Sequence, residues 1–593
     1  MRALTQARLL LGLGLLALAG ACAVPRPPAV SARFDAESEA FAAQWMRLSP
    51  ERATVAQYFE RSEQDTLDGQ LATQARLREG QAALARSGLA QAQGWLAGPL
   101  SADQRVGALT LQWSLQRTLA AMPFEGHNFA FNQLNGLQVR SVNLLTHIQP
   151  LRRPTDLQNY LARMALLPER FDEAIASTRS AAAKGLLPPR FILERARSQI
   201  EAFLQPTAAN NLFVTALTER SARIPGLLPE QRALAMQQAE RLVAEQVRPA
   251  YQRALALLIE LHPNTTADAG LWRLPDGAAA YAQALASNTT TAMTAERIHV
   301  LGLREVARIE GEMDRVLQAI GRRDGSVRER MQKLNAENQP PGEPDPRPQL
   351  LARYTALVRE AEQRSAALFN LRPQAPVDVR RVPALTERTA SAHYTTPTPD
   401  GSRPGSFWVP LPGPSFNVLG MKSLAIHEAV PGHHFQLALQ QEQASLPRWR
   451  QLRVFGGGSA HSEGWALYAE RLAIDSGWYE GDALSLLGAL DAQLFRARRL
   501  VVDTGLHAKR WTRQQAIDYG ISVSEVERYV ANPGQACAYM IGMLHILALR
   551  DEAQRALGPK FDLKAFHDVV LKTGSVPLDV LSDVVRRWVQ TAA

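Results

Sequence analysis

The sequence predicts a mainly α-helical fold, a multi-helix body with one small β-hairpin beside a histidine-rich site. Between residues 33 and 335 the chain consists largely of Ala, Leu, Gln, Arg and Glu, which are good helix formers. Apolar residues recur there at intervals of three and four positions, which is the spacing along one face of a helix. By contrast, a short stretch around residues 391–409 alternates in the manner of β-strands.

The length of the chain and the changes in its composition predict more than one region. Its 593 residues exceed the size of a typical single domain. We expect an N-terminal helical region over residues 33–335 and a second region, which holds the histidine motif, over residues 350–593. The intervening residues 336–349 are rich in proline and acid, and we expect them to form a linker or a long surface loop.

The first 22 residues have the layout of an export signal. A basic start precedes a short apolar run, which is too short to span a bilayer. The run ends in AGAC at residues 19–22, which resembles a bacterial lipobox, and simple cleavage after Ala21 is the alternative. The lipobox interpretation predicts an exported protein that faces the periplasm or the cell exterior. A lipid on Cys22 would anchor it to the membrane, and residues 23–32 would form an extended tether.

Charge and cysteine content exclude some classes of function. The net charge of +9 comes from arginines scattered along the expected helices, which is typical of solvated faces. The sequence has no zinc-finger spacing, no Gly-rich phosphate loop and no basic stripe interleaved with aromatics, so no nucleic-acid partner is expected. If Cys22 is lipidated, Cys537 is the only thiol left, and we expect it to pack in an apolar environment.

Several element boundaries can be predicted from proline and turn residues. Pro229 is suited to the first turn of a helix, and Pro249 should kink or split the helix that continues to Leu261. A hairpin is expected where residues 391–395 and 406–409 flank a turn rich in Pro and Gly.

The stretch HEAVPGHH, residues 427–434, contains the start of a zinc-peptidase pattern but not its end. The usual HExxH pattern places two histidines four residues apart on one helical face. Here Pro431 occupies the position of the second histidine. In an undisturbed helix, six residues turn the chain through roughly 600°, so His433 would leave the face of His427. His434 would share that face but lie about 10 Å along the axis, too far for a common zinc ion.

Pro431 and Gly432 offer a way to bring the histidines together. Proline cannot donate a backbone hydrogen bond, and glycine permits backbone angles that are closed to other residues. If these two residues loop out of the helix, the pattern is restored with His433 as the second ligand, and His434 packs or supports a ligand. The alternative is an ordinary helix end that carries histidines.

A third ligand is expected from the helix that follows Gly456-Gly457-Gly458. Two imidazoles and one carboxylate, with a fourth position left to water, form the open site of catalytic zinc. Glu463 is our candidate, His461 is its competitor, and a first-turn residue that complements the helix dipole is the alternative interpretation of Glu463. Glu470, two turns further on the same side, should orient a zinc-binding histidine. Glu428 would take a proton from the zinc-bound water and pass it to the leaving amine.

Several further stretches are specific in composition and together cover nearly the whole chain after the signal. With these stretches the chain resembles a bacterial domain-of-unknown-function family of lipoproteins with an HExxPGH motif, which is similar to the gluzincin metallopeptidases. The resemblance implies that His427, His433 and Glu463 bind zinc and that Glu428 is the base. The matching stretches are FNQLNGLQVRSVNLLT (131–146), AAKGLLPPRFILER (182–195), PDGSRPGSFWV (399–409), SEGWALYAERL (462–472), LFRARRLVVDTGLH (494–507) and PGQACAYMIG (533–542).

Two downstream stretches supply candidates for substrate contacts. Arg499, Asp503 and His507 are four residues apart and therefore share one helical face, and Tyr539 lies at the start of a later helix. Peptide hydrolysis develops an oxyanion, so Tyr539 and His507 are the candidate donors. Arg499 could hold a substrate carboxylate. A structural ladder of ion pairs is the alternative for the three residues on the shared face.

These features predict a zinc-dependent hydrolase of peptide bonds with one Zn²⁺ per chain. Short peptides are the expected substrates, and an arginine near the site would favour carboxypeptidase or dipeptidase action. Two alternatives stay open: hydrolysis of a non-peptide amide or ester at the same zinc, and a non-catalytic envelope lipoprotein that retains the fold.

Overall fold

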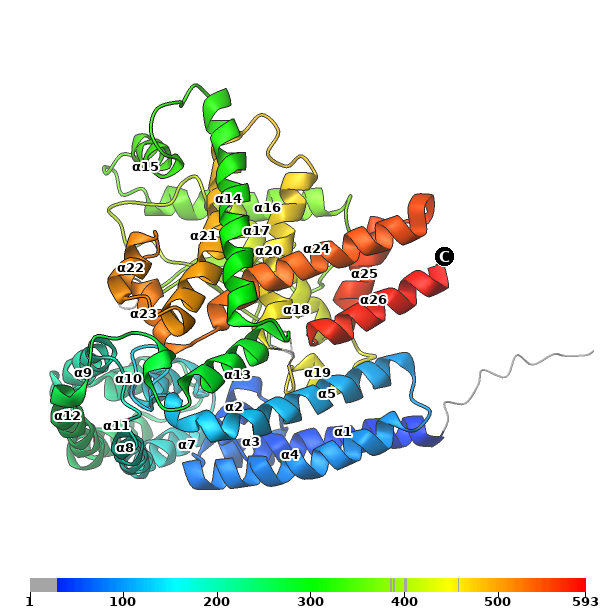
Figure 1. Cartoon of the computed structure of the whole chain (residues 1–593). Coiled ribbons are helices and arrows are strands. Elements are labelled where there is room, and N and C mark those ends of the chain that lie inside the picture. The colour runs from blue at the N-terminus through cyan, green and yellow to red at the C-terminus, as the bar shows by residue number, and fades with distance from the viewer. Residues whose placement is uncertain are drawn as a thin grey trace, which may run out of the picture.

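The computed structural model describes residues 29–592, apart from 384–386, 388–389, 399–400, 402 and 457. The expected export signal, Cys22 and most of the expected tether lie outside the described residues. Within them the chain is mainly helical with a three-stranded sheet, which confirms the predicted fold class (Figure 1). None of the helices in this part of the chain is long and apolar enough to cross a membrane.

The N-terminal helices form a layer at the bottom of Figure 1, in which α1, α4 and α5 pack along one another. The core of this layer contains Phe41 and Trp45, and it also takes in Trp449 and Phe455 from the second half of the chain. The Trp449 indole donates to Ser38 Oγ at 3.2 Å. The elements are α1 (Ala29–Arg47), α2 (Pro50–Ala56), α3 (Arg61–Asp68), α4 (Gln74–Leu96), α5 (Ala102–Ala121) and, later in the chain, α19 (Arg448–Gln451).

A second group of helices surrounds its own aromatic core at the lower left of Figure 1. The Tyr251 ring lies 4.3 Å from the Phe171 ring and 3.9 Å from the Phe203 ring, centroid to centroid. The elements are η1 (Met122–His127), α6 (Leu137–Asn143), η2 (Leu144–Ile148), α7 (Pro154–Ala165), α8 (Leu167–Ala183), α9 (Arg190–Leu204), α10 (Leu212–Ser221), α11 (Pro229–Leu242), η3 (Val243–Val247) and α12 (Arg248–Leu261).

Pro249 interrupts the helix that begins at Pro229, as the sequence predicts. Helix α11 passes into the π-turn η3, and α12 follows at Arg248. A proline ring clashes with the carbonyl group four residues earlier. The wider π-turn makes room for that ring while the chain keeps its direction.

The remaining elements contain the largest core, which holds the histidine motif, and a smaller core around Tyr529 that includes α22 and α23. Helix α14 packs along α21, and α20 packs along α24 (Figure 1). The core contains residues from both sides of 336–349, so the division of the chain at that loop stays a prediction. The elements are η4 (His262–Asn264), η5 (Leu271–Arg273), α13 (Gly277–Thr289), α14 (Ala295–Ala319), α15 (Val327–Glu337), α16 (Arg347–Ser365), α17 (Met421–Glu428), α18 (His433–Glu442), α20 (Ser459–Asp475), α21 (Ala483–Ala508), α22 (Arg513–Asp518), α23 (Val523–Ala531), η6 (Gln535–Cys537), α24 (Ala538–Leu557), η7 (Gly558–Lys560), α25 (Leu563–Thr573) and α26 (Leu578–Ala592).

The sheet contains the predicted hairpin and one further strand. Strands β2 (His393–Thr395) and β3 (Gly405–Val409) are antiparallel, with Tyr394 opposite Phe407. Strand β1 (Val377–Arg381) pairs in parallel with β3, which gives the order β1-β3-β2. The sequence did not indicate β1, because the alternation of apolar and charged residues in its VDVRR segment extends over only four positions.

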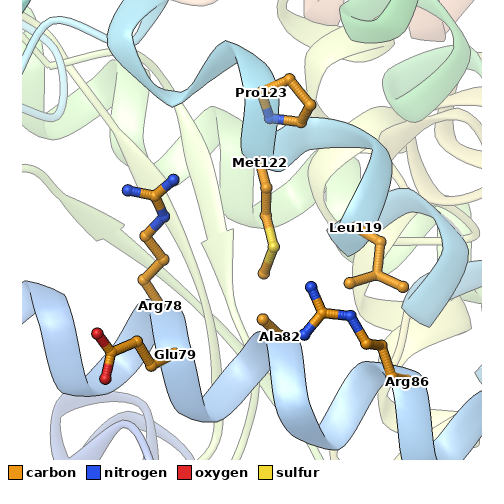
Figure 2. Close-up of a pocket in the computed structure, with 7 residues that line it drawn as sticks. All are labelled: Arg78, Glu79, Ala82, Arg86, Leu119, Met122 and Pro123. Atoms are coloured by element: carbon orange, nitrogen blue, oxygen red, sulfur yellow. The ribbon is translucent and has the colours of Figure 1, made fainter.

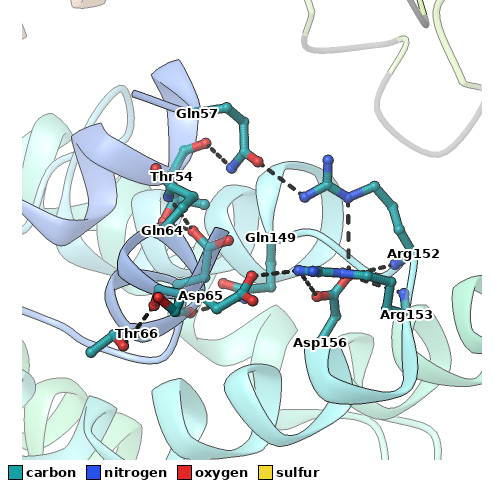
Figure 3. A network of polar contacts seen from close by, with 11 residues as sticks. Thr54, Gln57, Gln64, Asp65, Thr66, Gln149, Arg152, Arg153 and Asp156 are labelled. Atoms are coloured by element: carbon teal, nitrogen blue, oxygen red, sulfur yellow. Dashed lines mark hydrogen bonds and ion pairs between the residues drawn. The ribbon is translucent and has the colours of Figure 1, made fainter. Parts of the chain in front are cut away.

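A buried carboxylate fixes the start of α7 against α3. Asp156 accepts hydrogen bonds from the backbone N–H groups of Arg152 and Arg153, at 2.7 and 3.1 Å, although its own side chain is only 1% exposed. The Arg153 guanidinium lies 3.1 Å from the same carboxylate and also binds Asp65 of α3 (Figure 3). The carboxylate therefore satisfies helix N–H groups that would otherwise be unpaired.

Asp156→Ala should lower the free energy of unfolding by about 2 kcal/mol, because it leaves two partly buried N–H groups without an acceptor. Asp172→Ala is the matched control, since Asp172 forms an exposed ion pair with Arg253 and should change the free energy by less than about 1 kcal/mol. Urea denaturation of both variants measures the difference. Equal losses in the two variants would contradict this role of Asp156.

Candidate metal centre

The motif HEAVPGHH is divided between two helices. Helix α17 ends at Glu428, and α18 begins at His433. Residues 429–432 are non-helical, and the Val430–Pro431 peptide bond is cis. The expectation that two residues loop out of one continuous helix is therefore corrected, because the chain stops one helix and starts another.

Glycine is the only residue type that fits at position 432, between the two helices. A Cβ atom at this position would lie 2.0 Å from the carbonyl oxygen of His427 and 2.3 Å from that of Ile426. No side chain can be accommodated at such distances from backbone atoms. The Pro431 carbonyl accepts a hydrogen bond of 2.8 Å from the Trp465 indole, so the connection is also bonded to α20.

The broken helix brings His427 and His433 together with Glu463. One ligand atom from each of the three residues lies within 4.8 Å of the other two. Glu463 Oε2 is 3.2 Å from His433 Nε2 and 3.6 Å from His427 Nε2. The two imidazole rings meet edge to face, with their centroids 4.9 Å apart.

The donor set fits a zinc ion. Glu463 Oε2 and His433 Nδ1 are buried and have no hydrogen-bond partner among the described residues. A buried carboxylate oxygen between two imidazole nitrogens, without a hydrogen bond of its own, is the environment that a cation would satisfy. Glu463 lies in the second turn of α20, whose first turn contains no acidic residue, so the helix-dipole interpretation of Glu463 does not apply.

Glu470 orients the first histidine from the same helix that carries Glu463. His427 Nδ1 donates to Glu470 Oε1 at 2.7 Å, which directs Nε2 toward Glu463. Ser423 donates to the other oxygen of Glu470, and Arg496 Nη2 lies 3.4 Å from the carboxylate. The sequence predicts the contact of Glu470 with a histidine but not these two supports, which come from separate helices.

The electrostatics of the metal-free cluster favour a charged His427. Burial opposes the charge, but Glu463 and Glu470 raise the pKa of His427 to about 9. Burial also opposes ionisation of Glu463, and His433 and His427 nevertheless hold its pKa well below the usual range. The carboxylate is therefore ionised at neutral pH, and the proton on His427 is the one that a metal ion would have to displace.

Glu428 adjoins a ligand in the sequence, whereas His434 and His461 make contacts away from the cluster. Glu428 follows the first ligand and is buried at the end of α17. His434 turns to the hairpin, where its Nδ1 lies 2.9 Å from Tyr394 Oη, and burial lowers its pKa to about 4. His461, the competitor for the third ligand, accepts a hydrogen bond of 3.1 Å from the Val576 N–H and is not part of the cluster.

Tyr539 lies next to the cluster. Its ring is nearly parallel to that of His427, with an angle of 16° and a centroid distance of 6.3 Å. The Arg499 guanidinium lies over the Tyr539 ring, 4.3 Å from its centroid. Burial and the charge of Glu463 raise the pKa of Tyr539, so its hydroxyl keeps its proton at neutral pH. Of the two predicted oxyanion donors, Tyr539 is the one that lies beside the cluster, and its role as a donor stays a prediction.

The structure corrects the expectation for His507. Its Nδ1 accepts from the Leu271 N–H at 3.1 Å, and its Nε2 lies 3.1 Å from the Tyr529 carbonyl oxygen. Both ring nitrogens are thus occupied by backbone groups, and no donor is left for an oxyanion. Asp503, one turn earlier, is also structural, because it accepts from Tyr281 Oη at 2.6 Å and from the Gly534 N–H at 3.0 Å.

Two cavities in the described part of the chain lie outside the cluster. One of about 640 Å³ lies between α4, α5 and η1, where Figure 2 shows Met122 between Arg78 and Arg86. The other, of about 230 Å³, is lined in part by Val430 and His434. It adjoins the broken motif but contains none of the three cluster residues.

Comparisons with known proteins place the chain in a family. A family described as "bacterial protein of unknown function (DUF885)" matches residues 50–585, which include every residue of the cluster. The chain belongs to this family.

Two solved structures are similar to this DUF885 chain over nearly its whole length. A "putative lipoprotein" from Colwellia psychrerythraea is 31% identical, with a TM-score of 0.85 over 95% of this chain and 100% of its own. A "putative lipoprotein of unknown function" from Shewanella oneidensis is 20% identical, with a TM-score of 0.70 over 93% and 99%, and it shows the fold alone. The comparison with curated proteins found no match.

Zinc binding should release a proton at neutral pH, because His427 has a pKa of about 9 in the metal-free protein and must be neutral as a ligand. Calorimetric titration with Zn²⁺ in buffers of different ionisation enthalpy should show about one proton released from this residue at pH 7. The release should decline as the pH rises through 9, and the affinity should rise over the same interval.

Glu470→Gln tests the cause of this behaviour. The variant should bind zinc about 10- to 100-fold more weakly, because the carboxylate that orients the His427 ring is gone. It should also release fewer protons, because the same carboxylate raises the pKa of His427. Glu480→Gln, which changes an exposed carboxylate, is the control. A proton release that is constant from pH 7 to pH 10 in the unaltered protein would contradict the assignment of His427.

Proposed function

We propose that this protein is a zinc-dependent hydrolase that cleaves peptide bonds in short peptides. The observation that carries the proposal is the convergence of His427, His433 and Glu463, with ligand atoms within 4.8 Å of one another and Glu463 Oε2 buried without a hydrogen bond. Two imidazoles and one carboxylate leave a fourth position of a tetrahedral zinc site free, which is the arrangement of catalytic zinc.

The chain supplies the ligands and their orientation. His427, His433 and Glu463 would hold the ion, and the hydrogen bond from His427 to Glu470 would keep the first ring in place. Bound zinc supplies a Lewis acid that polarises a carbonyl group and makes water more acidic.

Proton transfer and oxyanion stabilisation are assigned to two neighbours of the ligands. Glu428 adjoins the first ligand in sequence and is 6% exposed, so it can accept a proton from the attacking water and deliver it to the leaving amine. Tyr539 keeps its hydroxyl proton and contacts the His427 ring, so it can donate a hydrogen bond to the developing oxyanion.

Export and lipid anchoring form the second part of the proposal. The AGAC sequence at residues 19–22 and the apolar run before it support lipidation at Cys22. Both solved relatives bear the word lipoprotein in their descriptions. On this proposal the enzyme faces the periplasm or the cell exterior, where short peptides are its substrates.

Glu428→Gln should separate an enzyme from a binding protein. The variant should keep about one zinc per chain and lose about 10²- to 10⁴-fold of its peptidase rate, because the amide cannot accept the proton. Mass-spectrometric analysis of a digested peptide library gives the rate, and metal analysis of the purified protein gives the zinc content.

His433→Ala is the companion variant and should lose the zinc. Zinc retained in His433→Ala would refute the ligand assignment. A wild-type protein with stoichiometric zinc that cleaves amides or esters but no peptide would favour the non-peptide alternative. A zinc-loaded protein that cleaves none of these substrates would favour the non-catalytic lipoprotein.

Cys22→Ala should move the protein from the membrane fraction to the soluble fraction, because an export signal that is cleaved without lipidation leaves no anchor. Fractionation of expressing cells measures the distribution, and intact mass spectrometry of the unaltered protein should show the lipid on its first residue. A wild-type protein that begins after Ala21 without added mass would refute this part of the proposal.

A further inference from the structure

Arg499 lies beside the candidate metal centre with part of its hydrogen-bonding capacity unused. A guanidinium group has five N–H donors. The Arg499 Nε–H donates to Tyr529 Oη at 3.1 Å, and Nη2 donates to Glu525 Oε2 at 3.0 Å. Nη1 is buried, and within the described residues it has no hydrogen-bond partner. A buried donor without an acceptor is costly, so this nitrogen requires an explanation.

Aromatic stacking does not replace the missing acceptor. The Arg499 Cζ atom lies 4.3 Å from the ring centroid of Phe495 and 4.3 Å from that of Tyr539. Such contacts use the faces of the guanidinium, whereas its N–H bonds lie in its plane. The two rings therefore fix the orientation of Arg499 and leave the Nη1 hydrogens available.

Arg499 and Arg528 form ion pairs with the same carboxylate. Glu525 is shared, because it pairs with Arg499 at 3.0 Å and accepts from both Nε and Nη2 of Arg528 at 3.1 Å. Burial opposes the charge of Glu525, and the two arginines still lower its pKa to about 2. Arg528 directs its remaining nitrogen, Nη1, to Gln535 at 2.6 Å. Of these two guanidinium groups, only that of Arg499 thus keeps a nitrogen, Nη1, without an acceptor among the described residues.

Arg499 lies within a short peptide's reach of the metal ligands. Two contacts in series connect them, from Arg499 Cζ to the Tyr539 ring at 4.3 Å and from that ring to the His427 ring at 6.3 Å. An extended chain advances about 3.3–3.6 Å per residue. A group held by Arg499 would therefore be about one to three residues from a carbonyl group at the metal.

We infer that Arg499 binds the free α-carboxylate of the peptide substrate, so that the protein cleaves close to the C-terminal end of short peptides. The inference rests on the proposed function and specifies its substrate class. A carboxylate is planar, accepts hydrogen bonds from a guanidinium fork and brings a negative charge to an arginine that shares its ion-pair partner, Glu525, with Arg528. A neutral amide would satisfy the hydrogen bond but bring no charge.

The test compares N-acetylated tripeptides in two forms, with a free C-terminal carboxylate and with a C-terminal carboxamide. Equilibrium dialysis of an equimolar library against metal-free protein measures binding without catalysis. The protein should retain the free acids about 10- to 100-fold more strongly than the amides. With zinc-loaded protein, the ratio of kcat/KM for acids to that for amides should be of the same order.

Arg499→Met should reduce both ratios to about one, because it removes the donor and the charge. Glu525 keeps its pairing with Arg528 in this variant, so the site retains a balanced ion pair. Arg498→Met is the matched control on the same helix, since Arg498 pairs with Glu310 at 2.9 Å, and it should leave the ratios unchanged. Arg499→Lys keeps the charge without the planar fork and should give intermediate ratios.

The unaltered protein alone can overturn the inference, whatever the stability of the variants. Equal retention of acids and amides by wild-type protein would refute carboxylate binding, as would discrimination that persists in a folded Arg499→Met variant. Equal cleavage of both forms would support the proposed function and refute the inference. Retention of acids without any hydrolysis by the zinc-loaded protein would refute the proposed function and leave the carboxylate site standing.

Discussion

The candidate metal centre depends on the packing of one helix, α20, against both parts of the broken motif. Trp465 binds the Pro431 carbonyl of the connection, Glu463 meets the two histidines, and Glu470 holds His427 from behind. All three residues belong to α20, where Glu463 and Glu470, seven positions apart, share one face, and Trp465, two positions after Glu463, lies roughly 200° around the axis from it. Neither α17 nor α18 alone fixes the distance between the histidines. The third helix, α20, fixes this distance, so a precise site can be built from two helices that are separated by a non-helical connection.

Most of the ionisable groups around the site are paired, but several of their buried nitrogen and oxygen atoms have no hydrogen-bond partner among the described residues. Buried charges are stable only when they are paired and hydrogen-bonded, and Glu470, Glu525 and Arg528 follow this rule. Glu463 Oε2 and Arg499 Nη1 do not, since each is buried without a hydrogen-bond partner among the described residues. One is an acceptor and the other a donor, and they lie on either side of Tyr539, which contacts both Arg499 and the His427 ring. A cation at the first and an anion at the second would complete both.

Local signals in the sequence were sufficient for much of the fold and for the central residues of the site. Pro249 marks its helix break because a proline ring acts on the turn immediately before it. Glu463 is expected because an open zinc site needs a third ligand and because of the family resemblance, and helical spacing then places Glu470 on the same side. His507 could not be interpreted in this way, because its two partners, Leu271 and Tyr529, come from distant parts of the chain and offer only backbone atoms, which no residue type reveals. Strand β1 was missed for a similar reason, since its pairing with β3 and not its own composition makes it a strand.

The close approach of Gly432 to the carbonyl oxygens of His427 and Ile426 also has a consequence for how such proteins are found. A search for histidines four residues apart assumes that both ligands belong to one uninterrupted helix. Here six positions separate them. The features that bring them together are a glycine that no other residue can replace and a tryptophan more than thirty positions later. Chains with this architecture are missed by a pattern that requires histidines four residues apart, but a pattern that includes the glycine and the later helix would recover them.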